Sequence, residues 1–255
     1  MIKKTILVSL VFLISYGAFL IYNTPSSWVI SRVDSQLAPL QAQISEPRGS
    51  AWSGHGQLEI GSIDVGRIGW HTRIWPLVTG HVEANLRLRG NGIEAHGKLI
   101  ANRSRLRVDG LKGRADLALL ARIAGLPNTA VGTLTANLKT VGFSQQGLLQ
   151  EAQGEIDVHK ARLPSLNVDL GTLFLHLKDS KTGNTIHAAL NNQGGDLDIN
   201  GQITLNGGTR YNLIAYLKPH AGQKNDPMRD ALSAMIGAPD AQGRYRYVTS
   251  GRLHP

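Results

Sequence analysis

The sequence predicts a mainly β protein: a single N-terminal transmembrane helix followed by a large antiparallel β-meander, curled into a sandwich, barrel or taco-like groove, with two or three short helices. The first observation behind this prediction is an uncharged apolar segment near the N-terminus. The second is an apolar–polar alternation of period two over most of the remaining chain. The third is the abundance of glycine, 29 residues against 5% aromatic residues, which is typical of short strands joined by many turns.

The apolar segment is residues 5–22 (TILVSLVFLISYGAFLIY), which follow Lys3 and Lys4; the next charged residue is Arg32. A helix of this length rises about 27 Å, close to the thickness of a bilayer's hydrocarbon core. A signal peptide is the alternative, but residues 17–22 lack the A-x-A-like arrangement of a cleavage site. We therefore expect an uncleaved membrane anchor. Its lipid-facing side chains are predicted to be Ile6, Leu7, Val8, Leu10, Val11, Phe12, Leu13, Ile14, Phe19, Leu20 and Ile21.

The two lysines before this segment set its orientation. By the positive-inside rule they keep the N-terminus in the cytoplasm, so the rest of the chain lies in the periplasm of a bacterial cell. The predicted organisation is a cytoplasmic N-terminus (1–4), a transmembrane helix (5–22), a juxtamembrane stem helix (23–39) and a periplasmic β-rich domain (40–255). We expect a single-pass protein of the inner membrane, which makes nucleic acid an unsuitable partner.

The stem helix is predicted from apolar residues at helical spacing. Trp28, Ile30, Val33 and Leu37 share one face, and Pro39 ends the helix. Such a stripe either packs on the following domain or forms an interface with a partner helix.

From residue 40 onward the period changes from helical to two. Asn91-Gly92 supplies a hairpin turn within the clearest run, residues 80–120, and slips of phase at Gly61 and Gly66 indicate bulges. Roughly a dozen strands follow from this counting. Their apolar positions include Leu58 and Ile60; Ile68 and Trp70; Val82, Ala84, Leu86 and Leu88; Ile93, Ala95 and Leu99; Leu106 and Val108; Leu134, Ala136 and Leu138; Leu173, Leu175 and Leu177; Ile199 and Ile203; and Leu213, Ala215 and Leu217.

Two short helices interrupt the alternation. One is expected at Leu117–Ile123, with Gly125 and Pro127 as stop signals, and the other at Asp226–Ile236. A final strand is expected at residues 245–248. Because so few helices are available to cover the apolar face of the sheet, the sheet must fold over on itself as a sandwich, barrel or groove.

Composition excludes several kinds of chemistry. The chain has no cysteine, so it has no disulfide, thiolate metal site or cysteine nucleophile. The formal charge of +9 comes from basic residues that are spread along the chain, and alone it does not choose a partner. Arg103, Arg105 and Arg107 form a basic ladder on one strand face, which is either solvated or meets an acidic partner or lipid headgroups.

No motif in the chain forms a catalytic or metal site. Residues 92–99 (GIEAHGKL) partly match a phosphate loop, but Leu99 stands where Ser or Thr belongs and no helix follows. His81 and His96 could meet across neighbouring strands, although a metal needs three or four converging ligands. The carboxylates of Asp196 and Asp198 share one strand side, whereas glycosidase carboxylates face each other. The expectation is a protein that is not an enzyme, with no cofactor, metal or small-molecule substrate.

The two ends of the β-rich region resemble the type II secretion system protein N family. The N-terminal resemblance lies in residues 49–54 (GSAWSG), Trp70 and residues 75–77 (WPL), and the C-terminal resemblance lies in residues 236–245 (IGAPDAQGRY) and 251–253 (GRL). The positions that carry it are Gly49, Trp52, Gly54, Trp70, Trp75, Pro76, Gly237, Pro239, Asp240, Gly243, Tyr245 and Gly251. Within the first stretch, the two glycines Gly54 and Gly56 are expected to allow a bend, with Trp52 as a large plug in an aliphatic core.

The resemblance implies an accessory inner-membrane component of the apparatus that exports folded proteins from the periplasm across the outer membrane. Its partners would be other apparatus proteins, either inner-membrane assembly proteins or the secretin, together with inner-membrane lipids. The β-meander is also similar in pattern to AsmA-type proteins, which implies a lipid-binding or lipid-transfer module as the alternative. A packed, closed core would favour protein contact, and an open apolar groove holding acyl chains would favour lipid.

Overall fold

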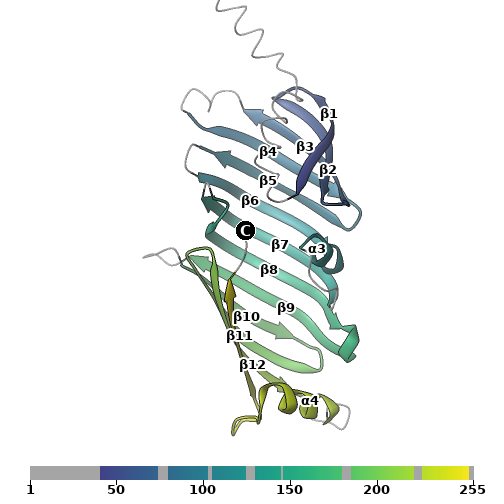
Figure 1. The fold of residues 1–255 in the computed structure, drawn as a ribbon, viewed down its shortest axis with the longest axis vertical. Coiled ribbons are helices and arrows are strands. Elements are labelled where there is room, and N and C mark those ends of the chain that lie inside the picture. The colour runs from purple at the N-terminus through teal and green to yellow at the C-terminus, as the bar shows by residue number, and fades with distance from the viewer. Residues whose placement is uncertain are drawn as a thin grey trace, which may run out of the picture.

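The computed structural model describes residues 41–73, 80–102, 105–124, 130–144, 146–179, 185–220 and 226–252. These residues form one antiparallel sheet of 13 strands, in which the order of the strands is their order along the chain (Figure 1). The strands are β1 (Ala42–Gly49), β2 (Ser53–Ile60), β3 (Ile63–Arg73), β4 (Val82–Gly90), β5 (Ile93–Ala101), β6 (Arg105–Asp116), β7 (Val131–Ser144), β8 (Leu149–Leu163), β9 (Val168–Asp179), β10 (Thr185–Gln193), β11 (Leu197–Asn206), β12 (Arg210–Pro219) and β13 (Tyr245–Arg252).

The alternation of the sequence becomes the two faces of this sheet. Ala84 pairs with Leu99, Leu99 with Val108, and Val108 with Val141, so the apolar residues of successive strands stand side by side. The same registration continues to the last strands, where Ile203 pairs with Leu213. The opposite face carries the polar residues, because neighbouring positions on a strand point to opposite sides. One apolar face therefore runs through the whole sheet.

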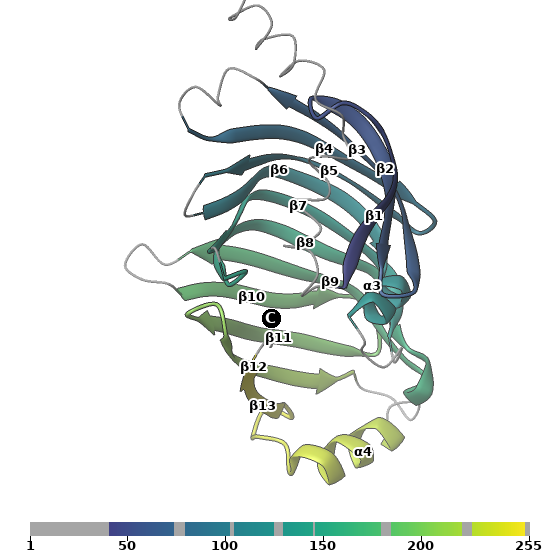
Figure 2. The same ribbon diagram turned by 45° about the horizontal axis from the view of Figure 1, so that its top comes forward.

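The sheet is curved into a trough, with β1 to β3 turned over at one end (Figure 2). On the apolar face, Ala152 of β8 packs with Ile186 of β10 and Leu205 of β11 although β9 lies between β8 and β10, and Tyr211 of β12 packs against the same cluster. Side chains converge in this way on the concave side of a curved sheet, so we assign the apolar face to the inside of the trough.

The trough is open. In the described part of the chain β1 pairs with β2 alone and β13 with β12 alone, so the first and last strands do not join. Of the 16 buried apolar residues described, seven are alanines, which is too little bulk for the filled interior of a sandwich or small barrel. The open groove is therefore confirmed among the three predicted closures, and the sandwich and the barrel are wrong.

Glycines allow adjacent strands of the trough to approach closely at the predicted slips of phase. Gly66 of β3 has φ +130°, and a Cβ there would overlap the backbone of Arg89 and Gly90 on β4. A Cβ on Gly90 would overlap the carbonyl of Val65. The pairing of β2 with β3 shifts beside this point, between Leu58 and Glu59, as a bulge does.

Two α-helices accompany the sheet, as predicted. α3 (Leu117–Ile123) follows β6 and buries Leu119, and α4 (Asp226–Ile236) precedes the last strand and contacts it. A single turn of 3-10 helix, η3 (Pro164–Leu166), joins β8 to β9. The predicted final strand is confirmed and extends to Arg252.

The predicted membrane anchor (5–22) and stem helix (23–39) lie outside the described residues. Within the described residues, no helix combines the length and the hydropathy needed to cross a membrane.

Candidate functional site

The corner between β1 and β2 contains the first part of the predicted motif and is held by Ser50. The Ser50 hydroxyl accepts hydrogen bonds from the backbone N–H groups of Trp52 (3.3 Å) and Ser53 (3.2 Å). From β3, Thr72 binds the corner twice: its N–H donates to the Trp52 carbonyl (2.7 Å) and its hydroxyl to the Ala51 carbonyl (3.2 Å). The corner is therefore fixed to the third strand.

Trp70 is the indole that is built into this corner. Its Nε1–H donates to the Ser50 carbonyl (3.1 Å), and its ring lies against Gly54, where an added Cβ would stand 2.6 Å from Cζ2. Gly49 has φ +98° and leaves no room for a side chain beside Ser53. Trp52 itself is half-buried. Trp75 and Pro76 lie outside the described residues.

The C-terminal part of the motif is a turn centred on Asp240. Its Oδ1 accepts the backbone N–H groups of Gln242 and Arg244, both at 2.9 Å, and its Oδ2 accepts Nε–H of Arg244 at 2.9 Å. The hydrogen bond from the Arg244 N–H is the main reason that the pKa of Asp240 is lowered. Gly243 takes the left-handed conformation that closes the turn, with φ +73°. Pro239 precedes it and is exposed.

This turn joins α4 to β13 through Tyr245. The Tyr245 side chain is buried, and its hydroxyl donates to the Arg229 carbonyl (3.3 Å) and lies 3.1 Å from the Ser233 hydroxyl. Gly237 ends the helix, with φ +93° and its N–H bonded to the Ser233 carbonyl (3.1 Å). Gly251, near the end of β13, lies where a Cβ would stand 2.8 Å from the Tyr211 ring. The motif residues that are described thus hold the first and last strands of the sheet; their role as a family signature stays a prediction.

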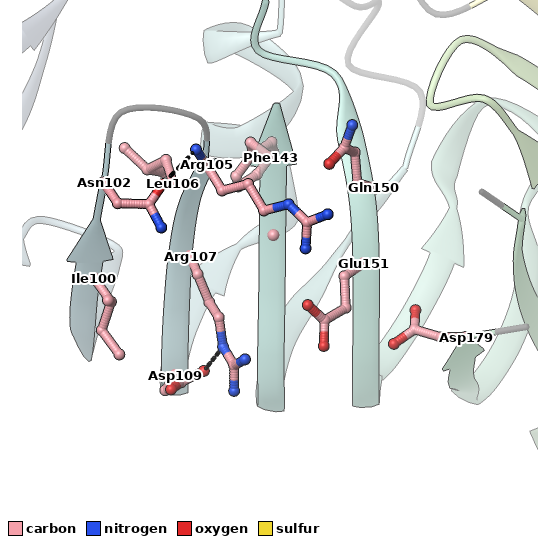
Figure 3. A pocket seen from close by; sticks show the side chains of 11 residues that line it. Ile100, Asn102, Arg105, Leu106, Arg107, Asp109, Phe143, Gln150, Glu151 and Asp179 are labelled. Carbon is pink, nitrogen blue, oxygen red and sulfur yellow. Dashed lines mark hydrogen bonds and ion pairs between the residues drawn. The ribbon is translucent and has the colours of Figure 1, made fainter. Parts of the chain in front are cut away.

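A hollow of about 820 Å³ lies at the ends of β5 to β9 (Figure 3). Arg105 and Arg107 of the predicted basic ladder line it, with the carboxylates of Asp109, Glu151 and Asp179. Arg103 lies outside the described residues. The hollow is therefore charged with both signs and not uniformly basic.

Charged side chains of the hollow make hydrogen bonds to other groups of the sheet. Nε of Arg107 donates to Asp109 at 2.6 Å, and this hydrogen bond, with further attraction from Glu151, raises the pKa of Arg107. Asp179 accepts the backbone N–H of Ala152 at 2.7 Å. Among the described residues, the lining contains no serine, cysteine or histidine, and its side chains are mixed, since Ile100, Leu106 and Phe143 stand beside the charged groups.

The structure does not place His81 and His96 next to each other. The hairpin registration places His96 opposite Arg87, whereas His81 lies beyond the end of the paired region, where Val82 pairs with Ala101. His81 lies instead 3.6 Å from Glu83, a carboxylate that also binds Lys98. The hydrogen bond from Lys98 at 2.7 Å is the main cause of the lowered pKa of Glu83.

The predicted carboxylate pair is also arranged differently. Asp196 lies in the bend before β11, where its Oδ2 accepts the N–H of Asp169 at 2.8 Å, and only Asp198 belongs to the strand. Asp198 lies 2.8 Å from Nε2 of His220. The two carboxylates are thus structural, with separate partners.

The remaining motifs of the sequence are parts of the sheet. Residues 92–99 run through the β4–β5 turn into β5, with no helix after the glycines, so the phosphate-loop interpretation is excluded. Within the described residues no three His, Asp or Glu side chains are grouped as a metal would require.

The geometry thus consists of a curved sheet with structural corners at both ends. A sequence model of the family described as type II secretion system (T2SS), protein N matches residues 41–248, which is nearly the whole sheet. The chain belongs to the type II secretion system protein N family. A relative in this family, the type II secretion system protein N of Aeromonas hydrophila, is 25% identical over 264 residues, which cover 98% of this chain and 100% of the relative. No solved structure matches the chain.

The family match covers most of the corner residues described above. Gly49, Trp52, Gly54 and Trp70 all fall inside it, and so does the Asp240 turn. The sequence analysis identified these positions but did not predict that Ser50 makes the hydrogen bonds that hold the first corner. The available signal was the Ser at the start of a tight turn, a residue type that often accepts backbone N–H groups two and three positions later.

Proposed function

We propose that this protein is a non-enzymatic accessory component of the type II secretion system, anchored in the inner membrane by residues 5–22. Its periplasmic sheet contacts other apparatus proteins while folded proteins are exported across the outer membrane. The observation that carries the proposal is the family match over residues 41–248. The name of the Aeromonas hydrophila relative, which aligns over its full length, supports the same role.

The shape of the sheet supports a role in contact. Thirteen strands in one layer give an extended polar outer face, which is a surface that a partner can reach. The non-enzymatic part of the proposal rests on the family, whose description names a component of the secretion system.

Crosslinking in intact cells with identification by mass spectrometry tests the proposal. We expect adducts with an inner-membrane assembly protein or the secretin, and loss of secretion of a type II substrate in a deletion strain. Complementation with the wild-type chain is the control. The proposal is overturned if the adducts contain neither class of protein and the deletion strain secretes normally.

A lipid-binding module is the second candidate, favoured by one observation: the open trough with its continuous apolar inner face. Many of its aliphatic side chains, among them Leu86, Leu175 and Leu213, are half-buried. The comparisons with known proteins do not support this role. Extraction of lipids from the purified β-rich domain, obtained without residues 1–22 and without detergent, tests it; the role fails if no acyl lipid is present in stoichiometric amount.

A further inference from the structure

The two edges of the sheet differ in whether another strand can be added to them. The edge strand β1 is interrupted: Pro47 lacks an N–H group, Glu46 has φ +49°, and the pairing with β2 shifts between Ser45 and Arg48. Proline, bulges and charges of this kind protect an edge from pairing with another chain. β1 is therefore a protected edge.

The edge strand β13 has none of these interruptions. It pairs with β12 through eight successive positions without a shift, and it has no proline and no residue of positive φ. In the described part of the chain, no backbone hydrogen bond joins residues 246–252 to any element other than β12. The side chains of Tyr247 and Val248 are 38% and 48% exposed. β13 thus offers a regular, accessible edge of high β propensity.

The outer face beside this edge is basic. Arg246 and Arg252 of β13 stand on the same side as Arg210 and Lys218 of β12, since Arg252 pairs with Arg210 and Arg246 with Tyr216. All four basic side chains are exposed, and neither strand contains a carboxylate. Two acidic groups around these strands have partners: Asp198 pairs across from Lys218 and contacts His220, and Asp240 is bound by Arg244. An exposed carboxylate, Asp230, lies on α4. A strand added at this edge would therefore lie beside two arginines of β13 that are six positions apart.

The inner side of the same strand sets a second requirement. Tyr247 and Thr249 point to the inner face, opposite Ala215 and Leu213 of β12. A strand added beside them continues the apolar inner face, so its inward positions must be apolar or β-branched. The edge thus requires apolar residues at alternate positions of the added strand as well as negative charge.

We propose that the edge of β13 binds an extended, acidic segment of a partner protein, which pairs with it as a fourteenth strand. Carboxylates of the segment lie opposite Arg246 and Arg252, and its alternate apolar residues extend the inner face. Backbone hydrogen bonds supply the affinity, and the alternating side chains supply the specificity. This inference adds a binding site, the edge of β13, to the proposed contact role. It rests on that proposed role only for the identity of the partner.

A second copy of the chain is the less suitable occupant. Antiparallel self-pairing centred on Thr249 places Arg246 of each copy opposite Arg252 of the other, and like charges directly opposite are destabilising. We therefore expect the full-length protein in nanodiscs to remain monomeric. A concentration-dependent dimer that is tightened by the single change Arg252→Glu, which sets a carboxylate opposite Arg246 of the other copy, would overturn the acidic-segment proposal in favour of self-pairing.

The direct test uses end-blocked peptides and the full-length protein in nanodiscs. The acidic probe is Glu-Val-Thr-Val-Thr-Val-Glu, and the control probe has Lys in place of both Glu. We expect the acidic peptide to bind and to slow hydrogen exchange of the backbone amides of residues 246–252. The double variant Arg246→Glu with Arg252→Glu is expected to lose about tenfold or more in affinity for it and to prefer the Lys peptide.

The matched control variant is Arg67→Glu with Arg87→Glu, which makes the same charge change on exposed arginines of β3 and β4. It should leave the peptide affinity within about twofold, apart from long-range charge effects that salt screens. Unchanged exchange in β4 to β9 of each variant shows that the sheet is folded. The proposal is overturned if neither peptide binds, if protection appears on other strands, or if both double variants respond alike. A secretion defect in the deletion strain would still stand in that case, so the two proposals fail separately.

Discussion

Ser50 shows how much of the first corner depends on single polar atoms. Its hydroxyl accepts two backbone N–H groups of the turn, and its carbonyl accepts the indole N–H of Trp70. Because Trp70 belongs to β3, the turn between β1 and β2 is tied to a strand twenty residues away in sequence. These hydrogen bonds hold the edge strand β1 to the sheet in addition to its backbone pairing with β2.

Gly54 gives a test of this corner. An added Cβ would stand 2.6 Å from the Trp70 ring and 2.5 Å from the Arg48 carbonyl. We expect Gly54→Ala to lower the free energy of unfolding by roughly 1–3 kcal/mol, the usual cost of overpacking. Urea unfolding of the purified protein measures it. Gly69→Ala on β3 is the control, since its Cβ meets nothing nearer than 3.7 Å. Equal effects of the two substitutions would contradict the packing role of Gly54.

Asp240 gives a pH-dependent test. Its pKa is lowered in the folded protein, chiefly by the hydrogen bond from the Arg244 N–H. Stability from this group is therefore present above the ordinary pKa of an aspartic acid and is lost as the pH falls through the lowered folded value. We expect the loop of residues 240–244 to exchange its amide hydrogens faster as the pH falls through this window, after correction for intrinsic exchange rates. Asp240→Asn should remove the pH dependence; a variant that keeps it would assign the effect to another carboxylate.

The residue scale is also where the sequence was least informative. Alternation identified Trp70 and the resemblance identified Trp52, but neither shows that the Trp70 indole binds the Ser50 carbonyl, because that depends on a contact between a turn and a later strand. The separation of His81 and His96 could have been predicted from the hairpin alone. A two-residue Asn91-Gly92 turn fixes Gly90 opposite Ile93, and counting outward from that pair already places His96 opposite Arg87.

At the scale of elements, the sequence predicted more. α3 and α4 occupy the predicted ranges, because their periodicity, stop signals and neighbouring strands all agree. The strands of residues 80–120 also follow the alternation. The bulges were placed less completely: Gly61 and Gly66 marked the slip between β2 and β3, but the slips of phase after Leu138 in β7 and after Val158 in β8, which coincide with shifts of pairing, were missed.

The attachment of α4 to β13 can be measured through Tyr245. Tyr245→Phe removes a hydroxyl that contacts Ser233 and the Arg229 carbonyl, at a cost of about 0.5–1.5 kcal/mol. We expect the free energy of unfolding to fall by that amount and the amides of α4 to exchange faster. Tyr247→Phe is the control, because that side chain is 38% exposed. If both changes are neutral, the hydroxyl does not hold the helix.

At the scale of the whole molecule, the sequence predicted the curved sheet but left its closure open. Whether a sheet of 13 strands closes depends on the total curvature that its bulges and glycines introduce. No local sequence pattern gives that total. The inner face is apolar along its whole length, yet its fully buried members are small. The trough is consequently a single layer with two ends, and these ends differ: β1 is interrupted and β13 is not.

The membrane anchor is the untested part of the whole-molecule prediction. Residues 5–22 are long enough to span a bilayer as a helix of about 27 Å. We expect the wild-type protein to stay in the membrane fraction after an alkaline wash. Replacement of residues 1–22 by a cleavable signal sequence should move the β-rich domain to the soluble periplasmic fraction.

The matched control for the anchor is Leu13→Ile, which keeps the segment apolar and should keep the protein in the membrane. Recovery of the wild-type chain in the soluble fraction would contradict the anchor.

The strict neighbour-to-neighbour order of the strands has a consequence for how the protein is made. Every strand after the first pairs with the one synthesised just before it, so the sheet can assemble in chain order, with β13 as the last strand to join. No strand waits for a distant partner. The same order lets a hairpin be gained or lost without rethreading the rest, so the length of the trough can change in evolution two strands at a time.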